Sequence, residues 1–244
     1  RKFSNLDDYD YNLESDSIEE KTEKEDSKGL DNDTEIKKKS EEYYNETSSD
    51  RVDVTSQKNH IYFYCAVNKK SCLKLNMLLK EISQRIIDNG ANHINKDRYI
   101  YLHINSFGGS VFAALSTIDT IKNLKIPVVS IIEGGAASAA TMISVVCSYR
   151  IIFKNSFMLI HQLSSGCWGK MNQLEDEMEN LKKLMNRIKS IYKENTKIDD
   201  DQLDNILKHD LWWDSKKCKI EGLVDEIRDK NDFIYTVDKK KIEI

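Results

Sequence analysis

The chain alternates between short apolar runs and longer segments in which apolar residues recur every three or four positions. Short runs of aromatic and β-branched residues predict strands, and the three-and-four spacing predicts amphipathic helices. The predicted strands are Ile61–Val67, Arg98–Asn105, Val128–Ile132, Tyr149–Phe153, Phe157–His161 and Leu223–Ile227. The predicted helices are Leu73–Ile87, Val111–Leu124, Ser138–Val146, Met171–Lys193, Asp199–Leu207 and Ser215–Glu221. This order predicts an α/β fold with crossover connections between strands.

Two of the predicted helices differ from the others. Ser138–Val146 is almost entirely apolar, which predicts a central and buried position. Met171–Lys193 is the longest periodic segment and has one apolar and one charged face. It is longer than a compact core usually needs, so we expect part of it to serve contacts between subunits.

Charge divides the chain into an arm and a body. Residues 1–57 hold 18 acidic and 9 basic side chains with almost no apolar periodicity, whereas the remainder is mildly basic. Such a segment buries too little apolar surface to offset the entropy of ordering, so we expect a disordered acidic arm. It fits an interaction tail, the remnant of a targeting sequence, or a solvated tail without a specific role. A folded domain over 58–230 and a C-terminal tail over 231–244 complete the expected organisation.

The spacing of cysteine and histidine argues against a metal site. The five cysteines are odd in number and lack C-x-x-C spacing, and the five histidines form no H-x-x-x-H pair. We therefore expect reduced, partly buried thiols and no structural metal. No window holds the roughly 20 apolar residues of a membrane helix, and we expect neither a membrane nor a nucleic-acid partner.

Small residues between the strand Val128–Ile132 and the next helix suggest a catalytic turn. The run Gly134–Ala139 lets the backbone turn sharply and places the Ser138 hydroxyl at a helix start. Free N–H groups at such a start stabilise developing negative charge. Ser138 is therefore a candidate nucleophile with an oxyanion site beside it.

A serine nucleophile needs a general base, and histidine suits this role because its pKa lies near neutrality. His161 ends the apolar run Phe157–Ile160, so a strand would carry it to a sheet edge, although a structural role fits the same position. The base in turn needs a carboxylate that orients it, and Asp210 is one candidate. Spacing alone does not choose between Asp210 and the other nearby acids. These are Asp199, Asp200, Asp201 and Asp204.

Five motifs follow one another in a defined order along the body. They are Ile104–Val111 (INSFGGSV), Gly134–Ser138 (GGAAS), Met158–Gln162 (MLIHQ), Asp210 and Glu221–Asp225 (EGLVD). The series resembles the proteolytic subunit of the Clp protease, the ClpP family, including its plastid paralogue ClpR. The resemblance covers about residues 59–228.

The resemblance implies a role for several of these residues. It assigns the nucleophile to Ser138, the general base to His161 and the orienting acid to Asp210. It assigns the oxyanion donors to the backbone N–H groups of Gly109 and Ala139. This assignment agrees with the chemistry inferred from the residues themselves.

The resemblance also implies a fold and an assembly. The fold would be a ClpP/crotonase-like core of repeated β-β-α units with a protruding handle, a strand plus the long helix, beginning around Leu163–Met171. Family members form heptameric rings, often stacked as tetradecamers, of one chain or mixed with a sister subunit. An AAA+ unfoldase feeds them polypeptide and uses the ATP, so we expect no cofactor bound directly to this chain.

Three positions depart from the usual family pattern: Phe107 and Leu163 stand where proline is usual, and Ala139 where methionine is usual. Three functions therefore fit the sequence. The first is a serine endopeptidase that degrades unfolded polypeptides in protein quality control, the second is a non-catalytic ClpR-like ring subunit, and the third is a crotonase-like acyl-CoA enzyme. The composition, rich in Asn, Lys and Ile, together with the likeness to ClpR, predicts a plastid-type organelle such as an apicoplast, or another organelle matrix, and not secretion.

Overall fold

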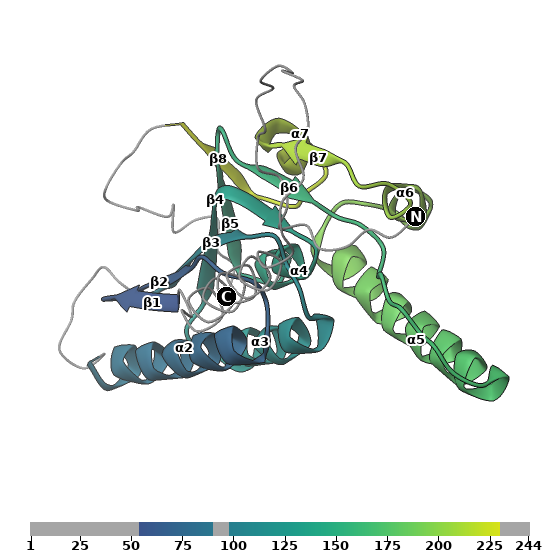
Figure 1. Cartoon of the computed structure of the whole chain (residues 1–244). Coiled ribbons are helices and arrows are strands. Elements are labelled where there is room, and N and C mark those ends of the chain that lie inside the picture. The colour runs from purple at the N-terminus through teal and green to yellow at the C-terminus, as the bar shows by residue number, and fades with distance from the viewer. Residues whose placement is uncertain (1–53, 90–97, 230–244) are drawn as a thin grey trace, which may run out of the picture. The chain divides into compact units, whose positions relative to one another are not determined.

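A mixed sheet forms the centre of the computed structural model, which describes residues 54–89 and 98–229 (Figure 1). The strands are β1 (Val54–Gln57), β2 (His60–Phe63), β3 (Ile100–Ser106), β4 (Val128–Ala137), β5 (Tyr149–Phe153), β6 (Phe157–Leu159), β7 (Trp212–Asp214) and β8 (Glu226–Arg228). Their order is β1-β2-β3-β4-β5-β8, and β6 pairs with the end of β4 and with β7. From β2 to β8 the neighbours in this order run parallel, whereas β1 and β7 pair antiparallel.

Helices form the crossovers between the parallel strands and cover the sheet. They are α2 (Lys69–Asn89), α3 (Val111–Asn123), α4 (Ala139–Val145), α5 (Met171–Asn195), α6 (Asp200–Ile206) and α7 (Ser215–Ile220). Helices α2 and α3 lie side by side, and α4 packs against α3 and α5 (Figure 1). All seven residues of α4 are buried, which confirms the predicted central position of this apolar helix.

The ordered body begins before the predicted boundary at residue 58. Strand β1 lies within the last four residues that we assigned to the acidic arm, and it pairs with β2 across a tight turn. Its sequence Val-Thr-Ser-Gln contains one apolar side chain, so hydrophobic periodicity does not indicate a strand there. Residues 1–53 of the arm and the predicted tail 231–244 lie outside the described residues.

Strand β4 extends five residues beyond its predicted end. It continues through Gly134 to Ala137 and pairs with β6 over Gly135–Ala137. A Cβ atom on Gly135 would lie 3.6 Å from the Phe107 ring and 3.7 Å from the Trp212 ring, which are ordinary contact distances, so both rings lie next to this end of the strand. The sharp turn lies at Ser138, within the predicted run, and the run before it belongs to the strand, where Gly134 has φ of 80°.

Three further boundaries near the C-terminal half differ from the predictions. Strand β6 ends at Leu159, so His161 lies in the following loop rather than in the strand. Strand β7 was not predicted, because its two tryptophans give no alternation. The last strand, β8, is displaced by three residues from the start of the predicted Leu223–Ile227.

The long helix leaves the core, as the comparison with a handle predicted. Its buried residues Ile188, Ile191 and Tyr192 all belong to the C-terminal third of α5. Toward its N-terminus, Met171 and Met178 are exposed, and Figure 1 shows this end running away from the sheet. The strand expected in the handle is not formed: residues 162–170 contain none, and none of the strands described in residues 54–89 and 98–229 pairs with them.

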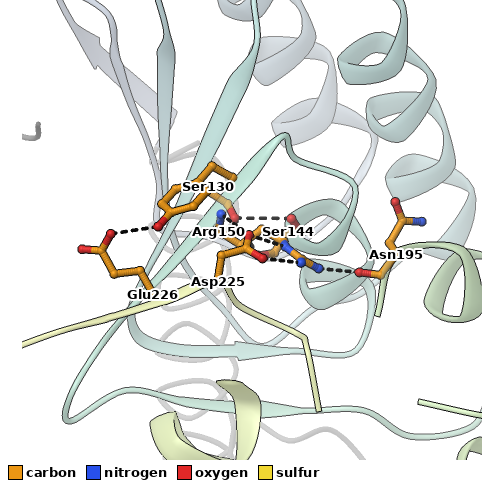
Figure 2. A network of polar contacts seen from close by, with 7 residues as sticks. Ser130, Ser144, Arg150, Asn195, Asp225 and Glu226 are labelled. Carbon is orange, nitrogen blue, oxygen red and sulfur yellow. Dashed lines mark hydrogen bonds and ion pairs between the residues drawn. The ribbon is translucent and has the colours of Figure 1, made fainter. Parts of the chain in front are cut away.

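A polar network holds the other end of α5 to the sheet (Figure 2). The Arg150 guanidinium, on β5, forms an ion pair with Asp225 at 2.7 Å. It also donates to the carbonyl oxygen of Asn195, the last residue of α5. The final carbonyls of a helix lack partners within it and favour a cation, so this contact fixes where α5 joins the body.

Candidate active site

Ser138 forms a one-residue turn between a buried strand and a buried helix. Strand β4 ends at Ala137 and α4 begins at Ala139, and Ser138 has φ of 55° and ψ of −124°. Positive φ is unfavourable for a residue with a side chain and persists only when the surroundings enforce it. The Ser138 N–H donates to the Leu159 carbonyl at 2.9 Å, so β6 holds one side of the turn. The residue is half-buried.

The carbonyl of Ser138 is held on the other side of the turn. It accepts from the Thr141 hydroxyl at 2.6 Å and from the Thr141 backbone N–H at 3.0 Å. The Tyr192 hydroxyl, which comes from α5, lies 2.5 Å from the Thr141 Oγ1. Sequence reasoning did not identify either residue, because a threonine within a helix and a tyrosine on an apolar face carry no catalytic signal.

A glycine loop lies directly against the Ser138 turn. Gly108 and Gly109 both have positive φ, 96° and 140°. A Cβ atom on Gly108 would lie 2.6 Å from the Ala137 carbonyl oxygen, 2.8 Å from the Ser138 Cβ and 3.1 Å from the Ala139 nitrogen. Glycine is required here because any side chain would displace the turn. The loop thus brings the backbone of Gly108 close to the start of α4, where the N–H of Ala139 has no acceptor within the helix, and Gly109 is the next residue of the loop.

His161 and Asp210 meet across two loops. The His161 Nδ1 lies 3.3 Å from the Asp210 Oδ1, and the side chains are 24% and 78% exposed respectively. The Gln162 N–H donates to the Leu207 carbonyl at 3.0 Å, which ties the loop after β6 to the segment before Asp210.

The other acidic candidates are engaged elsewhere or lie apart. Asp199 caps α6 by accepting from the Gln202 N–H, Asp200 pairs with Lys193, and Asp204 pairs with Lys189. Asp201 lies on the exposed surface of α6. Asp210 is the one of the five that the structure places against His161.

Ser138 and His161 belong to adjoining segments that β6 links. Among residues 54–89 and 98–229, no hydrogen bond joins the Ser138 hydroxyl to the His161 ring. Their segments are linked through Leu159, which accepts from Ser138 and precedes His161 by two residues. Catalytic hydrogen bonds often tighten only when a substrate is bound.

An aromatic pocket opens beside the glycine loop. It has a volume of about 440 Å³, and its lining residues are Asn105, Phe107, Gly134, Gly135, Phe157 and Trp212. The Phe107 and Trp212 rings pack edge to face with centroids 5.9 Å apart. Phe107 directly precedes Gly108, so this departure from the family pattern shapes the surface next to the turn. The position of Phe157 and Trp212 could not be anticipated, since they meet through the unpredicted pairing of β6 with β7.

The described part of the chain offers no metal-binding cluster. No group of three or more His, Cys, Asp or Glu side chains is placed to hold a metal ion within residues 54–89 and 98–229. In the same residues, no helix has both the length and the apolar character that crossing a bilayer requires.

Comparison with known proteins gives one family. The family model of the Clp protease matches residues 56–231. The ATP-dependent Clp protease proteolytic subunit of Streptococcus mutans is 35% identical over 137 residues, which are 54% of this chain and 70% of that protein. The ATP-dependent Clp protease proteolytic subunit 2 of Treponema denticola is 29% identical over 189 residues, 76% of this chain and 94% of that protein.

Among solved structures, a point mutant of ClpP1 from Listeria monocytogenes shares the fold with a TM-score of 0.62 and 23% identity, covering 72% of this chain and 94% of that one. Family members form rings that work with ATPase partners. The repeated strand–helix core, the glycine loop against the Ser138 turn and the family match over most of the body lead to one assignment: the chain belongs to the Clp protease family, as a subunit of the proteolytic type.

Proposed function

We propose that this chain is a catalytically active serine endopeptidase subunit. The observation that carries the proposal is the strained turn of Ser138, a non-glycine residue with φ of 55°. It stands at a helix start, against a loop whose two glycines exclude any side chain. Backbone strain of this kind costs about 1–3 kcal/mol and is typically retained where it has a function.

In the proposed reaction the Ser138 Oγ attacks a peptide carbonyl carbon while His161 takes the hydroxyl proton. The Nδ1 of His161 faces Asp210, which leaves Nε2 as the nitrogen that accepts the proton. The proton then passes to the leaving amine as the peptide C–N bond breaks and an acyl-enzyme forms. Water, deprotonated by His161, hydrolyses the acyl ester and restores the Ser138 hydroxyl.

The N–H groups of Gly109 and Ala139 would stabilise the oxyanion of each tetrahedral intermediate. Removing one such donor typically costs about 10²–10³ in kcat. His161 must approach Ser138 for the first step, because the two are not hydrogen-bonded in the described residues. Binding of a substrate or of a neighbouring subunit would provide that closure.

Labelling with a fluorophosphonate probe tests the proposal. Assembled wild-type protein should be labelled and should cleave an unstructured fluorogenic peptide, and Ser138→Ala should do neither. Ser190→Ala is the matched control, because the Ser190 hydroxyl donates an exposed hydrogen bond to the Asn186 carbonyl within α5. An assembled wild-type ring that neither labels nor cleaves would establish the alternative, a non-catalytic ClpR-like subunit.

For the assembly we propose stacked heptameric rings, of this chain alone or mixed with a sister subunit, served by an AAA+ unfoldase that delivers unfolded polypeptide. The exposed Met171 and Met178 near the free end of α5 support a contact between subunits there. Native mass spectrometry of Met178→Glu should give smaller assemblies than wild type. Asp176→Asn, an exposed change on the same helix, should assemble normally.

We also propose an organelle matrix of plastid type as the location, on the composition of the chain and its likeness to ClpR. Imaging of the protein tagged at its C-terminus and expressed with its native upstream sequence tests this, and a diffuse cytosolic signal would contradict it.

A further inference from the structure

The long helix reaches the Ser138 turn through one side chain. Tyr192 on α5 is 1% exposed, and its hydroxyl lies 2.5 Å from the Thr141 Oγ1 on α4. The Thr141 hydroxyl donates to the Ser138 carbonyl oxygen at 2.6 Å. Since Thr141 has a single hydroxyl proton and gives it to Ser138, the Tyr192 O–H donates to Thr141. The result is a buried pair of hydrogen bonds that leads from α5 through Thr141 to the carbonyl of Ser138. The Tyr192 hydroxyl oxygen also lies 3.5 Å from that carbonyl oxygen, so both hydroxyls converge on it.

These hydrogen bonds fix the orientation of the whole Ser138–Ala139 peptide unit. The carbonyl of Ser138 and the N–H of Ala139 belong to one planar trans peptide, so they point in opposite directions. Holding the carbonyl toward Thr141 therefore aims the Ala139 N–H away from it. That nitrogen lies on the side of the glycine loop, 3.1 Å from where a Gly108 Cβ would stand.

The surroundings favour a permanent donor at Tyr192. Burial raises the pKa of its phenol, and the hydrogen bond with Thr141 offsets only part of that effect. The hydroxyl therefore stays protonated and keeps donating across the working pH range. Thr141 is itself fully buried, so no water competes for either hydrogen bond.

We propose that Thr141 and Tyr192 are positioning residues: together they hold the Ser138–Ala139 peptide so that the nucleophile keeps its strained conformation and the Ala139 N–H points into the oxyanion site. This inference rests on the proposed peptidase function. It gives the handle helix α5 a direct structural part in the site, in addition to any contact between subunits.

The test uses substitutions that remove one hydroxyl each. Thr141→Val and Tyr192→Phe keep the size of the side chain, and Thr141→Ser restores the donor. In the assembled protein we expect kcat on a fluorogenic peptide to fall about 10–100-fold in Thr141→Val, less than for loss of an oxyanion donor, with KM changed less than about two-fold. The kcat of Tyr192→Phe should fall several-fold, and Thr141→Ser should keep most of the wild-type kcat.

Matched controls separate positioning from general loss of packing. Thr120→Val removes a hydroxyl that donates to the carbonyl four residues earlier on α3, and Tyr149→Phe removes a buried phenol that donates to Glu226. Both lie away from the turn and should leave kcat unchanged. The effects of the two substitutions should not add in the double variant of Thr141 and Tyr192, because both hydroxyls act on the same carbonyl of Ser138.

A second readout keeps the inference testable if the protein proves inactive. Hydrogen–deuterium exchange of the peptide covering residues 136–145 should be faster in Thr141→Val and Tyr192→Phe than in wild type or either control. If the fluorophosphonate probe fails to label the wild type, the proposed peptidase function is overturned. If the two variants still exchange faster than the wild type in that case, the positioning role is retained. The inference would be overturned if both variants had the kcat of the wild type. Where kcat cannot be measured, wild-type exchange rates in both variants would overturn it.

Discussion

Arg150 and Asp225 are joined by side-chain and backbone hydrogen bonds together. The Arg150 Nε and Nη2 donate to the two carboxylate oxygens at 2.9 and 2.7 Å, and the Asp225 N–H donates to the Arg150 carbonyl at 2.8 Å (Figure 2). A forked guanidinium–carboxylate pair of this kind is stronger and more directional than a single ion pair. It connects β5, the loop before β8 and the end of α5.

We expect Arg150→Ala to lower the free energy of unfolding by about 2 kcal/mol. The partly buried Asp225 carboxylate would keep only the hydrogen bond from the backbone N–H of residue 150, and the Asn195 carbonyl would lose its cation. Arg150→Lys should recover only part of this, since an ammonium cannot reproduce the fork. Lys154→Ala, which removes an exposed ion pair with Asp229, is the control and should cost less than about 1 kcal/mol. Urea unfolding measures all three, and equal losses for Arg150→Ala and Lys154→Ala would contradict the prediction.

Gly108→Ala should abolish the site with a smaller effect on the fold. A Cβ atom would stand 2.6 Å from the Ala137 carbonyl and 2.8 Å from the Ser138 Cβ, at a φ that alanine rarely adopts. Displacing the turn by about 1 Å is enough to cost ~10²-fold in rate. Fluorophosphonate labelling rates and thermal unfolding measure the two effects. Gly166→Ala, where no atom lies within 4 Å, should leave both unchanged, and normal labelling of Gly108→Ala would contradict the assigned geometry.

The Glu133 carboxylate should contribute to the free energy of unfolding at neutral pH and lose that contribution at acidic pH. Its burial raises the pKa, but hydrogen bonds from His103 and Tyr64 outweigh this and hold the pKa below its ordinary value of 4.5. A carboxylate with a depressed pKa stabilises the fold fully above the ordinary value and loses that contribution as the pH falls through the lower one. The stability gap between wild type and Glu133→Gln should therefore be large at pH 7 and shrink below about pH 4.5.

Urea unfolding at pH 7, 5 and 4 measures this gap. Glu81→Gln, an exposed change on α2, should show no such dependence. A constant gap for Glu133→Gln across the series would mean that the contacts of Glu133 with His103 and Tyr64 contribute nothing in the charged state.

One thiol should react far faster than the buried ones. Cys167 is exposed, whereas Cys72, Cys147 and Cys218 are buried. Burial raises the pKa of Cys147 and Cys218 to about 12, so their reactive thiolates are scarce at neutral pH. Titration with a disulfide reagent should show a fast phase that Cys167→Ser removes, and all five thiols should react after denaturation. Persistence of the fast phase in Cys167→Ser would contradict the burial pattern.

Elements with strong periodicity could be predicted from sequence, and those fixed by tertiary pairing could not. The α2 and α3 helices were expected from their apolar spacing, and α4 from its almost uninterrupted apolar character. Strand β7 and the extension of β4 exist because they pair with β6, and a local pattern of hydrophobicity contains no record of such a partner. The strand β1 likewise depends on pairing with β2 rather than on its own composition.

The candidate site divides in the same way. The order of motifs led to Ser138, His161 and Asp210, whereas spacing alone left five aspartates open. The choice among them depends on where the loop before β7 lies, which only the structure supplies. Thr141 and Tyr192 could not be predicted from the sequence, because they are 51 residues apart and meet only in the folded structure rather than in any motif.

The shortness of strand β6 determines how the candidate site would lose its geometry. Its last residue, Leu159, accepts the Ser138 N–H and precedes His161 by two residues, so the proposed nucleophile and the proposed base both depend on one strand of three residues. Short segments open at a lower free energy than the centre of a sheet. Partial opening of β6 would thus separate Ser138 from His161 while β2 to β5 stay folded, so the proposed site could be lost locally without global unfolding.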